Sequence, residues 1–147
     1  MEKLCPVEIT VDGKPIVNAL GAKIDSDSLT IRLDSTEYID LYPFNARMFA
    51  IASQRVDAER FVFEGPKLGL YCDTADPREG PYVNHLINRL EIHLHYLSPL
   101  TVQLEIKGSA DLARSSFDPC WYKGPSTGTW EFEVFFTHAF PPIVRWP

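Results

Sequence analysis

The sequence predicts a mainly β, single-domain protein: an antiparallel sandwich or barrel of about eight to nine short strands with one minor helix. Two observations predict this class. Apolar and polar residues alternate in several separate runs, and turn-forming residues lie between one run and the next. A two-residue period sends alternate side chains to opposite faces of a strand, so that one set enters a core. The clearest runs are residues 29–34, 90–95, 102–107 and 130–134.

The composition narrows the possible partners. The chain has 147 residues, 45% of them hydrophobic, which suits one ordered domain with a proper core. Its formal net charge is -6, and the 14 basic residues are scattered among 20 acidic ones. Phosphate binding needs clustered Lys and Arg, so neither nucleic acid nor a membrane surface is expected as a partner. No apolar run has signal-peptide or membrane-spanning length, and we therefore expect a cytoplasmic protein.

The first third of the chain contains four expected strands, at residues 7–11, 14–17, 29–34 and 38–42. Asp12-Gly13 is a hairpin turn between the first two. Pro43 ends the fourth, since proline cannot donate to a sheet ladder.

The middle of the chain is less uniform. Residues 45–58 are rich in helix formers, with Asn45 as N-cap, and predict one short helix. Short strands are expected at 61–63 and 68–72, followed by a long polar loop at 73–80. Residues 81–97 fit two descriptions, a helical stripe or an alternating strand, which leaves an α+β fold as the alternative class. We favour a strand from Arg89 onward, preceded by a helical turn.

The last third is expected to contain strands at 101–107 and 130–138, separated by a long connection from 108 to 129. Pro141 and Pro142 predict that the final strand ends at or before Phe140. The apolar phase of the alternating runs predicts a shared core. Its expected members are Ile31, Leu33, Leu104, Ile106, Phe132 and Val134.

Histidines offer the sharpest chemical motif. His93 and His95 would point to one side of a strand, roughly 7 Å apart, and His138 or His85 could supply a third metal ligand. However, His93 and His95 share their face with Arg89 and Glu91, a pattern typical of a solvated surface. We therefore expect no metal and no cofactor.

Other chemical signatures are weak. Cys5, Cys72 and Cys120 form no metal or disulfide framework, and Cys72 is expected in the core. Asp25 and Asp27 lie in a polar turn that lacks the glycine and distal glutamate of an EF-hand loop. No nucleophile elbow, phosphate loop or dinucleotide fingerprint is present.

Binding is therefore the leading hypothesis: a non-enzymatic module of inhibitor, immunity or adaptor type that binds another protein through loops and edge strands. The alternative is a small ligand or carbohydrate in an aromatic-lined cavity, and the third hypothesis is a metalloenzyme built on His93, His95 and His138. Exposed aromatic and charged loop residues are the expected contacts. They are Tyr42, Asp73, Asp76, Arg78, Glu79, Trp121, Tyr122 and Trp146.

Overall fold

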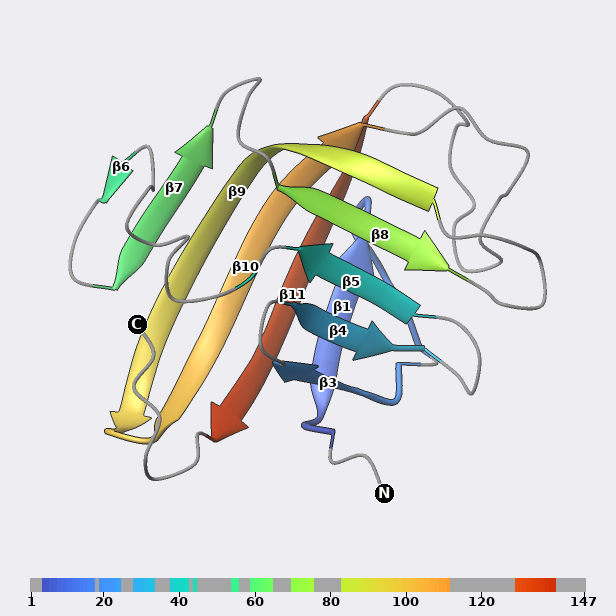
Figure 1. Ribbon diagram of the computed structural model, residues 1–147. Helices are drawn as coiled ribbons and strands as arrows, with labels where there is room; N and C mark the ends of the chain where they lie inside the picture. Colours follow the sequence, from blue (N-terminus) through green and yellow to red (C-terminus); the bar gives the residue numbers. More distant parts are fainter. Residues whose placement is uncertain are drawn as a thin grey trace.

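A computed structural model describes residues 4–17, 19–24, 28–33, 38–42, 44, 54–55, 59–64, 70–75, 83–111 and 129–139. These residues form a single antiparallel β-sheet of 11 strands and contain no helix, which confirms the mainly β class (Figure 1). It follows that none of them belongs to a helix of the length and hydropathy that a membrane crossing requires.

The sheet is open and is not closed into a barrel. Its main order is β2-β1-β11-β10-β9-β8-β5-β4-β3, and β7 pairs with both β9 and β6. The bounds are β1 (Val7–Val11), β2 (Lys14–Pro15), β3 (Gly21–Ile24), β4 (Leu29–Arg32), β5 (Tyr38–Tyr42), β6 (Gln54–Arg55), β7 (Arg60–Glu64), β8 (Tyr71–Ala75), β9 (Val83–Ser98), β10 (Thr101–Asp111) and β11 (Thr129–Ala139).

Strand β9 bends, and the two parts of it pair with different strands. Its first residues, 83–86, pair with β8, whereas residues 89–93 pair with β7. Opposite β10 the register slips between Ser109 and Ala110, so Asn88 is an extra residue in β9, a β-bulge. A bulge bends its strand and increases the local twist. As a result β3, β4, β5 and β8 form a smaller layer that crosses in front of β1, β11 and β10 in Figure 1.

The same bulge explains why residues 81–97 fit two patterns. Before it His85 and Ile87 are buried, and after it Leu90, Ile92 and Leu94 are buried. The phase change leaves two residues, Asn88 and Arg89, between Ile87 and Leu90, and this i to i+3 spacing imitates that of an amphipathic helix. The strand expected from Arg89 is confirmed. The helical turn expected before it is wrong, because β9 already begins at Val83.

The predicted core is confirmed. All six residues expected inside are buried in one hydrophobic cluster, and Cys72 is fully buried with them. Leu104 lies opposite Phe136, and Ile106 opposite Val134, so β10 and β11 present matched apolar rows. The ring of Phe132 packs over Gly108, where an added Cβ would overlap it.

Several boundaries differ from those expected. Residues 73–75 begin the predicted polar loop but belong to β8, and residues 108–111 belong to β10 rather than to the long connection. Strand β3 was not predicted, because four residues are too few to show an alternation. Of the helix expected at 45–58, only residues 54 and 55 are described, and they form β6. The final strand ends at Ala139, as the prolines predict.

His85 is a titratable group inside the core. It is 6% exposed, lies edge-on to Trp130, and its Nδ1–H donates to the backbone carbonyl of Asp111 over 3.1 Å. Burial lowers the pKa of His85 below the ordinary 6.5, and the Asp111 bond only partly opposes this. The folded protein therefore keeps this imidazole neutral at pH values where the unfolded chain has already taken up a proton.

This difference predicts a loss of stability in mild acid. The unfolded state binds more protons than the folded state below pH 6.5, so the free energy of unfolding falls as pH drops from 6.5 through the lowered pKa. Melting temperatures of the wild type and of His85→Phe, measured between pH 7.5 and 5, should diverge in slope, the variant showing the flatter profile. His138, whose pKa burial also lowers, remains in both proteins and cancels in the comparison. Parallel profiles would contradict the prediction.

Candidate functional site

Two of the residues expected to bind, Tyr42 and Asp73, lie in the described part of the chain, on the paired strands β5 and β8. Tyr42 ends β5, 49% exposed and opposite Tyr71. Asp73 lies within β8, where its backbone pairs with Asp40 and Asn84. The remaining expected contacts lie outside the described residues, as does Cys120. They are Asp76, Arg78, Glu79, Trp121, Tyr122 and Trp146.

The three histidines of the metalloenzyme hypothesis lie on two faces. His95 is aligned with Gln103 and Thr137, and like His93 it points away from the core. His138 is aligned with the buried Val102 and lies edge-on to the buried Phe136, on the opposite face of β11. Across the described residues, no three His, Cys, Asp or Glu side chains are grouped so that they could hold a metal ion.

The structure instead gathers charge on one surface, the side of β1, β11, β10, β9 and β7 that faces away from the core. We call this surface the outer face. Strand register aligns its side chains in rows across the strands. One row runs Glu8, Phe135, Glu105, His93, Arg60; the next runs Thr10, Glu133, Lys107, Glu91, Val62; the third runs Glu131, Ser109, Arg89, Glu64.

The outer face is strongly acidic. Among the described residues its carboxylates are Glu8, Glu59, Glu64, Glu91, Glu105, Asp111, Glu131 and Glu133. Its permanently charged bases are Arg60, Arg89 and Lys107. Eight negative charges less three positive ones leave five negative charges on one side of the sheet when the histidines are neutral.

One end of the outer face is held by internal contacts. Arg89 Nε donates to Glu64 over 2.8 Å and its NH1 donates to Glu91 over 3.3 Å, and the Glu64 bond is the main cause of the raised pKa of Arg89. At the bulge, Ser109 Oγ donates to the Asn88 side-chain oxygen, and Asn88 Nδ2 donates to Asp111 over 2.7 Å. These bonds orient the polar side chains around the bend of β9.

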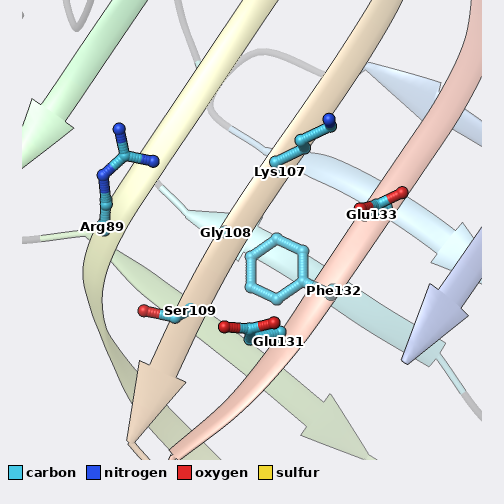
Figure 2. A pocket seen from close by; sticks show the side chains of 7 residues that line it. All are labelled: Arg89, Lys107, Gly108, Ser109, Glu131, Phe132 and Glu133. Carbon is cyan, nitrogen blue, oxygen red and sulfur yellow. The ribbon is translucent and has the colours of Figure 1, made fainter. Parts of the chain in front are cut away.

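A hollow of about 240 Å³ lies beside this end. Figure 2 shows Arg89, Lys107 and Ser109 on two neighbouring strands and Glu131 and Glu133 on β11, with Gly108 and Phe132 completing the lining. Within the described residues, no hydrogen bond or ion pair engages the side chains of Lys107, Glu131 or Glu133. These three charged groups are available to a binding partner.

Phe135 lies on β11, the second of the five strands that form the outer face. It is 40% exposed, and its register neighbours are Glu8 on β1 and Glu105 on β10. A second hollow, about 100 Å³, runs along it between β1, β10 and β11. The sequence contains a signal that could have singled it out, because Phe135 occupies the phase that Glu131 and Glu133 otherwise fill in this strand.

Comparisons with protein-family models, with curated proteins and with solved structures yield no match to this chain.

Proposed function

We propose that this protein is a non-enzymatic binding module that uses its outer face to bind a basic surface of another protein. The observation that carries the proposal is Phe135, a partly exposed aromatic side chain that lies between Glu8 and Glu105 on a face with five net negative charges. Interfaces typically combine an aromatic anchor near their centre with a polar rim. Phe135 can supply the anchor, and the surrounding carboxylates can supply the rim.

Charge complementarity sets the kind of partner. Glu131 and Glu133 lack partners among the described residues, so a lysine or arginine can pair with them without first breaking an internal bond. The excess of carboxylates attracts a basic surface over a distance and repels an acidic one. Raising the salt concentration should weaken such binding, since screening acts on exposed charges.

The hollow favours a protein partner over a small apolar ligand. Ligand pockets usually measure about 300–1,000 Å³ and are lined mainly by apolar side chains. The larger hollow on the outer face is about 240 Å³, and its lining combines Gly108 and the ring of Phe132 with two carboxylates, an ammonium, a guanidinium and a hydroxyl. Such a lining suits one cationic side chain of a protein partner.

A nona-arginine peptide can test the outer face directly. Its dissociation constant is measured by calorimetry for the wild type and for Glu131→Lys with Glu133→Lys. The matched control is Asp76→Lys with Glu79→Lys, which changes the net charge equally at two positions of the polar loop expected from the sequence. Reversing the two outer-face charges should weaken binding by about tenfold, more than the loop control does.

Phe135→Ala provides an independent test of the same surface. Guanidinium groups stack on aromatic rings, so this neutral change should weaken nona-arginine binding by about threefold. Circular dichroism and melting curves check that every variant is folded. Equal weakening by both charge reversals, with no effect of Phe135→Ala, would show that binding follows total charge and would contradict the proposal.

A further inference from the structure

We infer that the outer face binds its basic partner more weakly in mild acid, with His93 and His95 as the sensors. The inference rests on the proposed function, because it concerns the regulation of the same surface. Both histidines lie on the outer face in the part of β9 that pairs with β10, where the side chain of His93 is 30% exposed and that of His95 57%. Histidine is the side chain that ordinarily changes its charge between pH 5 and 8.

His93 lies between two carboxylates. Its Nε2 is 3.5 Å from Glu59 Oε2, and its Nδ1 is 3.4 Å from Glu105 Oε2. His95 Nδ1 is 4.0 Å from the same Glu59 oxygen. A neutral imidazole carries one N–H and can donate to one carboxylate, whereas the protonated ring can donate to both.

The surroundings of His93 contain other charges on every neighbouring strand. Arg60 on β7 is its register partner, Glu91 precedes it on β9, and Lys107 follows Glu105 on β10. Tyr96 also lies near Glu59, whose charge contributes to the raised pKa of this phenol, after burial. Among the side-chain types around His93, imidazole is the one whose protonation generally changes near neutral pH.

Protonation acts on binding in two ways. Each proton cancels one negative charge, so the outer face would fall from five net negative charges to three. In addition, the imidazolium of His93 can donate to both Glu59 and Glu105, which lowers the negative potential that these carboxylates present to a cationic partner. Both effects weaken attraction for a basic surface as pH falls, without any change of fold.

The test uses nona-arginine with an acetylated N-terminus and an amidated C-terminus, because arginine keeps its charge over this range and the capped peptide has no other titratable group. Affinities are measured at pH 7.5 and 5.5 at one ionic strength for the wild type and for His93→Gln with His95→Gln. The matched control is His138→Gln, which removes a histidine from the opposite face. The wild type and the control should bind about fivefold more weakly at pH 5.5, and the double variant should change by less than about twofold.

Two outcomes would overturn the inference: wild-type affinity that is equal at both pH values, or a double variant that keeps the full pH dependence. Melting curves at each pH show whether a variant remains folded. Failure of this inference is distinguishable from failure of the proposed function. Binding that still requires Glu131 and Glu133 but ignores pH contradicts only the pH dependence, whereas binding that ignores these two residues at pH 7.5 contradicts the proposed function itself.

Discussion

Replacing Phe132 by alanine is expected to lower the free energy of unfolding by about 3–5 kcal/mol. The side chain is 3% exposed, lies on the inward phase of β11, and its ring centroid is 5.3 Å from that of Trp130. Its removal leaves a cavity that the surrounding strands cannot fill completely. Urea denaturation measures the loss, and Glu133→Ala, on the outward phase of the same strand, serves as the control and should change stability by less than about 1 kcal/mol.

A double-mutant cycle sharpens this test. In the wild-type background, Gly108→Ala should lower the free energy of unfolding by about 1–3 kcal/mol, since the new Cβ overlaps the ring of Phe132. In the Phe132→Ala background the ring is gone, and the same change should cost clearly less. If the two substitutions are additive, the ring does not pack over Gly108 as described. If Phe132→Ala leaves stability unchanged, the phase of β11 is inverted.

Replacing Gly21 by alanine should also destabilise the protein strongly. We expect it to lower the free energy of unfolding by roughly 2–4 kcal/mol. Gly21 begins β3 with a φ of 156°, which non-glycine residues rarely adopt. An added Cβ would also lie 2.6 Å from the Cβ of Leu4 and 2.8 Å from the backbone oxygen of Cys5. Backbone atoms cannot yield as a flexible side chain would, and the backbone bonds between Cys5 and Ala22 hold this approach in place.

Gly13 provides the matched control for Gly21. It also has a positive φ, 78°, but an added Cβ would meet no atom within 4 Å. Gly13→Ala should therefore lower the free energy of unfolding by about 1 kcal/mol, because only the strain of the positive φ opposes the alanine. Equal losses at the two positions would show that the close approach of residues 4–5 to β3 contributes nothing. Thermal and urea denaturation of both variants measure the difference.

Some features of the site were within reach of the sequence. The exposed phase of β9 could be predicted, and it correctly places His93 and His95 away from the core. Phe135 could have been noticed as the apolar residue on the charged phase of β11. Glu8, Glu105 and Arg60 could not be grouped with it, because they lie far apart in the chain and meet only through strand register.

The sequence by itself determined the class of the protein and the inward phase of its long strands. Alternation with a period of two is a local property, so it identifies Leu104, Ile106 and Val134 as core residues whatever their neighbours are. Tertiary structure alone decided the bulge at Asn88, the pairing of β9 with both β8 and β7, and the assembly of the outer face from five strands. Strand pairing is non-local: a sequence pattern tells which side of a strand is buried, whereas the register tells which strands, and therefore which charges, lie side by side.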